Sequence, residues 1–193
     1  MTFNRTVLSE NIEKYGTEIN NYGPVLLAHL YSDRTHFIYE LLQNAEDAYG
    51  WGLKHQPSNN ISRTIKFALF NDHLQVTHFG LPFNEQHVRG ICGLVQGTKR
   101  DDLNAIGKFG IGFKSVYAYT LHPEIHSGEE HFVIESFVHP KPIAPRNLNP
   151  DETFFYLPLD NPTVSQEKAS AEIADRLIKL DCRTLLFLNH IHS

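Results

Sequence analysis

One stretch constrains the fold of this chain more than any other: residues 36–50, His-Phe-Ile-Tyr-Glu-Leu-Leu-Gln-Asn-Ala-Glu-Asp-Ala-Tyr-Gly. At the helical repeat its apolar side chains fall within about 140° of arc, which predicts an amphipathic helix with a core-facing stripe. The stripe consists of Phe37, Ile38, Leu41, Leu42, Ala45 and Tyr49. Ser32 or Asp33 can cap the start of this helix, and Gly50 is expected to end it.

A polar row borders that stripe. Glu40, Asn44 and Asp47 are spaced i, i+4 and i+7, so a helix stacks them along one face. The row lies next to the apolar side chains and not opposite them, where a solvated face normally lies. We therefore predict that the three side chains line a cleft at the edge of the core. A solvated polar edge is the simpler alternative.

A glycine-rich stretch follows farther along the chain, where residues 106–116 read Ile-Gly-Lys-Phe-Gly-Ile-Gly-Phe-Lys-Ser-Val. Its glycines leave the backbone open to close approach, and the residues after them can start a helix whose free amides attract an anion. The stretch is not a Walker A loop, because Phe113 separates the last glycine from the Lys-Ser pair. It is not a dinucleotide fingerprint either, because Ser115 stands where the third glycine belongs. We interpret it as a phosphate loop, with a flexible turn as the alternative.

A carboxylate–amide–carboxylate helix followed by such a loop resembles the GHKL ATPase superfamily, which includes DNA gyrase, the ninety-kilodalton heat-shock chaperone, histidine kinases and the MutL mismatch-repair proteins. The polar row and its next residue are similar to the N-box of that superfamily: Glu40, Asn44, Asp47 and Ala48. The loop is similar to its third glycine motif, in the form typical of the heat-shock-chaperone and sacsin branch: Gly107, Gly110, Ile111, Gly112 and Phe113. The resemblance spans roughly residues 25–190.

The resemblance implies the Bergerat ATP-binding fold, an α+β, two-layer α/β sandwich with a mixed β-sheet and helices on one face. It also implies ATP and Mg²⁺ as ligands. Glu40 would orient the attacking water, and Asn44 would give a neutral oxygen to Mg²⁺. Asp47 and Ala48 would lie beside the base and the ribose, and the backbone amides of residues 110–113 would surround the phosphates.

Three further positions carry expectations from the same resemblance. His78 and Gly80 stand at the first glycine motif, and His78 replaces the Asp or Asn that reads the adenine amino group. A neutral imidazole can still accept that hydrogen bond, and nucleotide affinity would then fall below about pH 6.5, near the ordinary pKa of histidine. The alternative is that His78 points away, a water or Thr184 reads the base, and ATP is barely preferred over GTP. We favour weakened selectivity for adenine. Thr184, at the start of a strand predicted at 184–188, would lie near the adenine.

Residues 93–107 lack a sustained period and are rich in small and polar side chains. Because this segment lies between two glycine motifs, the resemblance implies that it is the mobile ATP lid. Thr98, Lys99 and Arg100 are then the candidates to meet the terminal phosphates. A solvated loop with incidental charge is the alternative.

The remaining elements follow from local signals of period, capping and turn residues. An N-terminal helical segment at 1–32 holds short helices at 9–15 and 24–31. Other helices are predicted at 85–92 with Asn84 as its cap, after Ser115 to about residue 119, and at 165–179 with Ser165 as its cap. Strands are predicted at 63–70, 74–79, 131–138, 152–159 and 184–188, with a loop at 140–150.

Composition narrows the functional classes. The chain has 193 residues and a net charge of −5, so it lacks the basic footprint of a protein that binds nucleic acid or an anionic membrane. Its 2 cysteines argue against a disulfide framework, and no apolar run approaches the ~20 residues of a membrane span. The N-terminus lacks the apolar core of a signal peptide. We expect a single cytoplasmic domain over residues 1–193.

Together these features predict an ATP-binding, slowly hydrolysing domain whose lid closure drives conformational change in a larger chaperone-like or regulatory protein. Strong turnover by this chain alone is not expected, because downstream domains or a protein partner would complete the site. The N-terminal helices either form a strap in a homodimer or pack as an ordinary helix pair. The alternative function is a nucleotide-sensing or protein-interaction module without hydrolysis. A kinase is disfavoured because no phosphoacceptor-histidine helix can be recognised.

Overall fold

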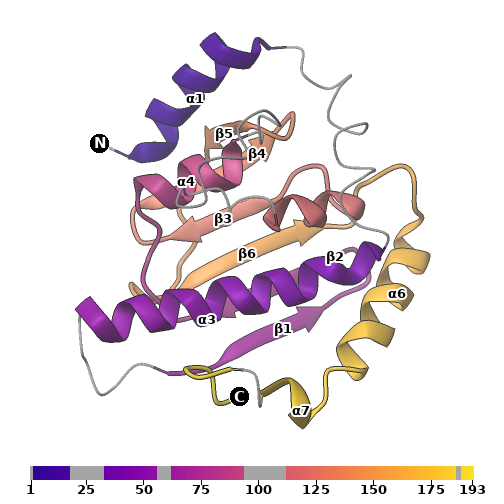
Figure 1. Cartoon of the computed structure of the whole chain (residues 1–193). Coiled ribbons are helices and arrows are strands. Elements are labelled where there is room, and N and C mark those ends of the chain that lie inside the picture. Colours follow the sequence, from indigo (N-terminus) through magenta and orange to yellow (C-terminus); the bar gives the residue numbers. More distant parts are fainter. Residues whose placement is uncertain (1, 18–32, 56–61, 94–111, 186–187) are drawn as a thin grey trace, which may run out of the picture.

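The computed structural model describes residues 2–17, 33–55, 62–93, 112–185 and 188–193 (Figure 1). Its helical elements are α1 (Phe3–Tyr15), the 3-10 turn η2 (Arg34–His36), α3 (Phe37–His55), α4 (Glu85–Cys92), the 3-10 helix η3 (Phe113–Ala118), α6 (Gln166–Ile178) and α7 (Cys182–Leu185). Its strands are β1 (Ile65–Leu69), β2 (His73–His78), β3 (Glu124–Ser127), β4 (Glu130–Glu135), β5 (His139–Pro142) and β6 (Thr153–Pro158).

The strands form one sheet in the order β1-β2-β6-β3-β4-β5, and α3 and α4 lie over the same face of it (Figure 1). The predicted α+β, two-layer architecture is confirmed. The prediction of a mixed sheet is wrong for the described strands, because every pair among them is antiparallel. Short turns join β1 to β2 and β3 to β4, which forces those pairs to be antiparallel, and β6 then enters between the two hairpins.

A row of directly paired side chains crosses the sheet beneath the helices. It consists of Phe67, Val76, Phe155, Ile125 and Phe132, whose registers place them on one face. All six apolar residues of the α3 stripe are at most 6% exposed, so the predicted core-facing stripe is confirmed. Its first half joins this row in one buried cluster, and the core therefore lies between α3 and the sheet.

The two ends of α3 differ in how well they were predicted. Asp33 caps the preceding turn, because its side chain accepts a 2.9 Å hydrogen bond from the backbone N–H of Thr35. Gly50 does not end the helix, which continues to His55. The glycine is needed for packing instead: a Cβ at Gly50 would lie only 2.8 Å from Nε2 of His190.

Several other boundaries are corrected. The first helix spans residues 3–15 and not 9–15, and the helix predicted at 24–31 lies outside the described residues. Strands β3 and β5 were missed. The two prolines of β5, Pro140 and Pro142, weaken a strand signal, but an edge strand tolerates them. The predicted strand at 184–188 is wrong, because α7 ends at Leu185. Helices α4 and α6 begin after their predicted caps.

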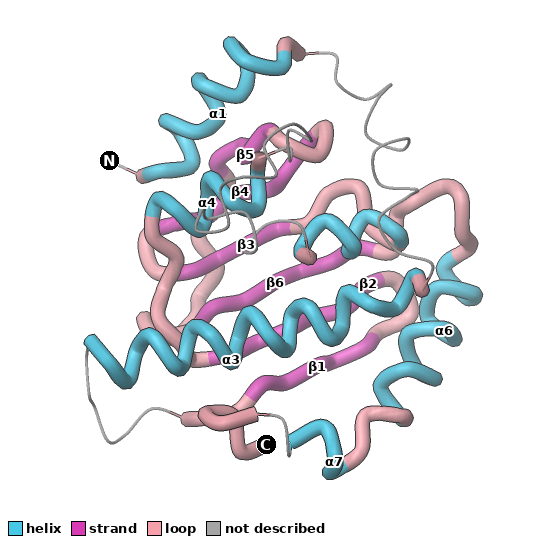
Figure 2. The backbone as a smooth tube through the Cα atoms, viewed as in Figure 1, coloured by secondary structure: helices cyan, strands magenta, loops and turns pink. Residues whose placement is uncertain are grey.

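The final residues lie beside the edge strand β1 (Figure 2). The backbone N–H of His192 donates to the carbonyl of Arg63 at 2.9 Å, and that of Ile65 donates to the carbonyl of Ser193 at 3.0 Å. These bonds cover part of the strand edge that would otherwise be open. Within the described ranges, no helix combines the length and apolar character that crossing a membrane requires.

Candidate functional site

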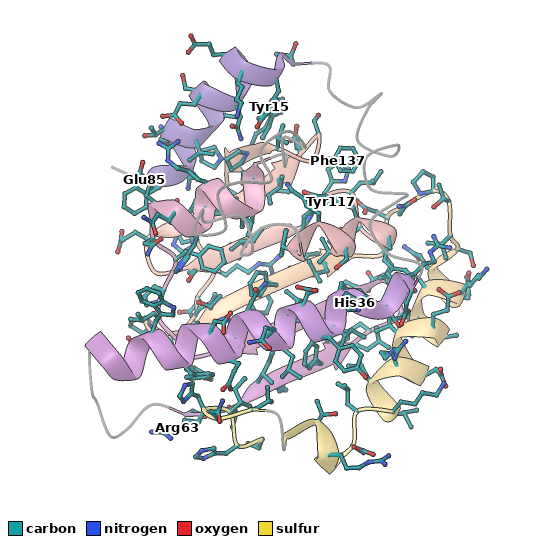
Figure 3. The ribbon with its side chains drawn as sticks, in the orientation of Figure 1. Tyr15, His36, Arg63, Glu85, Tyr117 and Phe137 are labelled. Carbon is teal, nitrogen blue, oxygen red and sulfur yellow. The ribbon has the colours of Figure 1, made fainter. Side chains whose placement is uncertain are left out.

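Glu40 lies in the first turn of α3, where His36 contacts its carboxylate. Its Oε1 lies 2.9 Å from Nε2 of His36, one turn earlier. Figure 3 shows His36 at this end of the helix. The helix start is fixed in turn by Asp33, which also pairs with Arg176 of α6. The carboxylate of Glu40 is thus oriented, and its side chain remains 26% exposed.

Gly112 brings the glycine-rich stretch against Glu40. A Cβ built on Gly112 would lie 1.7 Å from Oε2 and 2.3 Å from Cδ of Glu40, so no side chain fits while Glu40 keeps its place. The backbone there has φ −63° and ψ −42°, which any residue adopts, so the requirement for glycine is steric. Ser115 fixes the turn by donating from its N–H and its hydroxyl to the Gly112 carbonyl, at 3.0 and 2.5 Å.

The other two members of the polar row have different surroundings. Asn44 is partly exposed and lines a pocket, and no hydrogen bond joins its side chain to another described residue. Asp47 accepts a 3.0 Å hydrogen bond from Nε2 of Gln43 and is not among the residues that line the pocket. Asn44 therefore faces the pocket and Glu40 meets Gly112 beside it, whereas Asp47 lies on the partly exposed edge of the helix.

The predicted first glycine motif packs directly on α3. A Cβ at Gly80 would lie 2.6 Å from the Cβ of Ala48, so only glycine permits this approach. The N–H of Leu81 donates to the Ala48 carbonyl at 3.2 Å, and the N–H of Phe79 donates to the Tyr49 hydroxyl at 2.8 Å. These contacts fix the turn after β2 against the end of the polar row.

A pocket lies where α3, α4, η3 and the sheet meet. Its lining is mainly apolar and aromatic: Asn44, Ala48, His78, Leu81, Phe83, His87, Ile91, Phe113 and Phe155. The Phe155 ring is central to it, with ring centroids 6.0 Å from Phe113, 6.1 Å from Phe83 and 6.2 Å from His78. The predicted residues Asn44, Ala48, His78 and Phe113 therefore meet in one place.

The pKa of His78 lies well below the ordinary value for histidine. The side chain is 3% exposed, and burial lowers the pKa of its imidazole to about 4. Protonation of His78 near pH 6.5, on which a loss of nucleotide affinity at that pH would depend, is therefore not expected. Its Nδ1 also accepts a 3.2 Å hydrogen bond from the N–H of Gly80, so this nitrogen is already occupied.

The other predicted site residues either lie away from this pocket or fall outside the described ranges. Thr184 lies in α7, where its N–H donates to the Asp181 carbonyl at 2.9 Å, and it does not line the pocket. The remaining residues lie outside the described ranges: Thr98, Lys99, Arg100, Gly107, Gly110 and Ile111.

Two buried charged residues next to the motifs were missed. Glu46 is 5% exposed, and its carboxylate accepts hydrogen bonds of 2.6 to 3.2 Å from the backbone N–H groups of residues 189–191. Lys114 is 4% exposed and donates to the Phe137 carbonyl at 2.5 Å. That carbonyl lies in a turn where Ser136 and Phe137 both have positive φ, close to Tyr117 (Figure 3).

A sequence signal existed for only one of them. Glu46 borders the apolar stripe of α3 on the side opposite the polar row, so its helical position hinted at burial. Nothing local to Lys114 indicates that its side chain points into the core and not toward the candidate site. Burial lowers the pKa of its amine to about 8.

Comparison with known proteins agrees with this arrangement. A family model described as "Sacsin domain" matches residues 25–147. Protein NO VEIN of Arabidopsis thaliana is 34% identical over 121 residues, or 63% of this chain. Sacsin of Homo sapiens is 34% identical over 106 residues, or 52% of the chain. The chaperone protein HtpG of Treponema denticola is 33% identical over 125 residues, or 54% of the chain.

These relatives are much longer than the matched region, which spans 4%, 2% and 19% of their respective lengths. The family match nevertheless covers more than half of the chain and includes α3, the Gly80 turn and Gly112. The resemblance to the heat-shock-chaperone and sacsin branch of the GHKL superfamily is confirmed, and the chain belongs to the Sacsin domain family.

Proposed function

We propose that this chain binds Mg·ATP beside α3 and hydrolyses it slowly. The observation that carries the proposal is the contact between Gly112 and Glu40, because it joins the end of a glycine-rich stretch to the carboxylate of the polar row. The pocket next to this contact supports a flat ligand, since aromatic rings line it. The match to the Sacsin domain family and the similarity to HtpG chaperones support the same reading.

The residues present fit the two ligands. Asn44 offers a carbonyl oxygen without a partner among the described residues, and Mg²⁺ in proteins commonly takes one or two protein oxygens plus phosphates and water. The bound ion would neutralise phosphate charge. Glu40 would orient or deprotonate the attacking water through one oxygen while His36 holds the other. The backbone N–H groups of Gly112 and Phe113 would donate to phosphate.

The wider proposal keeps the chain as a single domain with residues 93–107 as its lid. Lid closure, with Thr98 and Lys99 meeting the terminal phosphates and Gly107, Gly110 and Ile111 at its base, would drive conformational change in a larger chaperone-like or regulatory protein. Domains beyond those described, or a second copy of the chain, would complete the assembly. The setting would be the cytoplasm.

One observation favours a second candidate, a sensor that binds nucleotide without turnover. Glu40 is already engaged, with Oε1 paired to His36 and Oε2 packed against Gly112. A carboxylate held in this way can order the site without accepting a proton from water.

The test measures binding and phosphate release separately. Asn44→Ala should weaken Mg·ATP at least about tenfold, because the metal loses its protein oxygen. Gln43→Ala, an exposed neighbour on the same helix, is the matched control and should bind like wild type. Glu40→Ala should retain binding and lose hydrolysis. Absence of any heat or thermal shift with millimolar Mg·ATP in folded wild type would refute nucleotide binding. Binding without phosphate release would establish the sensor.

A further inference from the structure

Among the described residues that line the pocket, few side chains are polar, and the most buried of these is His78. Its imidazole lies between aromatic neighbours, with ring centroids 6.1 Å from Tyr49 and 6.2 Å from Phe155. The other polar group that lines the pocket from α3 is the amide of Asn44. The chemistry that His78 presents therefore decides which edge of a flat ligand the pocket can bind.

The tautomer of His78 is fixed by its own turn. The N–H of Gly80 donates to Nδ1 at 3.2 Å, so Nδ1 must carry the lone pair. The ring is neutral at physiological pH because burial lowers its pKa to about 4. A neutral imidazole has one donor nitrogen, and here it is Nε2. Gly80 is itself held against Ala48, so the turn cannot easily supply a different bond.

A second histidine of the pocket follows the same rule. The N–H of Asn84 donates to Nδ1 of His87 at 3.2 Å, as part of the capping box of α4. In its neutral form His87 therefore also carries its proton on Nε2. Both histidines thus carry their proton on Nε2 when neutral, and none of the described residues that line the pocket is a carboxylate.

We propose that this pocket recognises a hydrogen-bond acceptor on its ligand, and that it binds purine nucleotides without selecting for the 6-amino group. The inference rests on the proposed function. Adenine offers N1 as an acceptor, and hypoxanthine or guanine offers its 6-oxygen. The 6-amino group of adenine is a donor, and placing it against Nε2–H would leave two donors facing each other.

Entry of a ring requires side chains to move. As described, the pocket holds about one water molecule, which is less than a purine needs. Its partly exposed lining residues Leu81 and Phe83 can make room, whereas His78 is fixed by Gly80 and the sheet. The donor is therefore the constant feature of the site.

The first test needs no variant. Calorimetry at pH 7.5 compares the Mg complexes of ATP, ITP and purine riboside triphosphate, which carry an amino group, an oxygen and no substituent at position 6. We expect three dissociation constants within about threefold of each other, because none of these ligands loses a hydrogen bond that the site makes. ATP binding more than tenfold tighter than both others would overturn this inference alone. Absence of binding by all three would overturn the proposed function as well.

Two further measurements test the residue. Nitrogen NMR of the imidazoles should show the His78 proton on Nε2, and a proton on Nδ1 would refute the tautomer. His78→Asp places an acceptor in the pocket and should create a preference for ATP over ITP of about tenfold. His73→Asn, on the same strand and outside the pocket lining, is the control and should leave the ratio unchanged. An unchanged ratio in folded His78→Asp would contradict the role of His78.

Discussion

The contact between Gly112 and Glu40 leads to a prediction about stability. Gly112→Ala should destabilise the wild-type protein and should stabilise a variant in which Glu40 is already alanine. In wild type, Gly112→Ala would put a methyl group 1.7 Å from Oε2 and 2.3 Å from Cδ of Glu40, far inside van der Waals contact. Glu40 must then leave its position, and its 2.9 Å contact with Nε2 of His36 is lost with it. The methyl group itself is compatible with the backbone, because φ at Gly112 is −63°.

The magnitude follows from these contacts. Overpacking a tight site costs about 1–3 kcal/mol, and losing a partly exposed i,i+4 pair adds about 0.5 kcal/mol. Alanine also restricts the unfolded chain, which stabilises by about 0.4–1 kcal/mol. Gly112→Ala should therefore lower the free energy of unfolding by about 1–2 kcal/mol. In a Glu40→Ala background the three atoms nearest to the built Cβ are absent. Gly112→Ala should then raise the free energy of unfolding by about 0.5 kcal/mol.

Urea unfolding of wild type, both single variants and the double variant measures this difference, with an expected coupling energy of about 2 kcal/mol. Gly16→Ala is the matched control. Gly16 has φ +74° and no atom within 4 Å of a built Cβ, so its cost is backbone strain and should be equal in both backgrounds. If Gly112→Ala changes stability equally with and without the Glu40 side chain, the two motifs do not meet as described.

Two further substitutions test the buried charges. Glu46→Gln should lower the free energy of unfolding by about 2–3 kcal/mol and speed amide exchange at residues 189–191, because three backbone N–H groups lose the buried, charged acceptor on which they converge. Asp47→Asn is the partly exposed control and should cost less than about 0.5 kcal/mol; equal costs would contradict the role of Glu46. Lys114→Met tests the buried amine, whose pKa is about 8 when folded and 10.5 in the unfolded reference. The unfolded chain binds more protons between these values, so wild-type stability should rise by about 2 kcal/mol relative to the variant from pH 7 to pH 9.5. Parallel pH profiles would refute it.

The parts of the site that local pattern controls were predictable. The α3 stripe and the caps of α4 and α6 follow from spacing within a few residues, and each was found where the sequence placed it. Of the polar row, Asn44 lines the pocket and Asp47 does not. The fold class followed from the resemblance to the GHKL superfamily, although local patterns missed β3 and β5. Strand direction did not follow, since β6 enters between two hairpins that precede it in the chain.

Properties that depend on distant partners could not be predicted. The pKa of His78 depends on how completely the sheet and α3 bury it, and its tautomer depends on the N–H of Gly80. The burial of Lys114 depends on a carbonyl in the turn between β4 and β5. In each case the residue type was visible in the sequence, but its environment is made by segments that the sequence alone does not bring together.

The glycines show this distinction most clearly. From sequence, Gly50 was interpreted as a helix end, through the conformational freedom of glycine. In the structure, neither it nor Gly80 nor Gly112 has positive φ, and each is needed because another group lies where a side chain would be. All three contacts involve α3: Gly80 against Ala48, Gly112 against Glu40, and Gly50 itself against His190. Helix α3 therefore sets the positions of the turn at Gly80, of the glycine-rich stretch at Gly112 and of the C-terminal residues 189–191. A shift of α3 would move all three together, so the site and the docking of residues 189–191 should respond as one unit to perturbations of this helix.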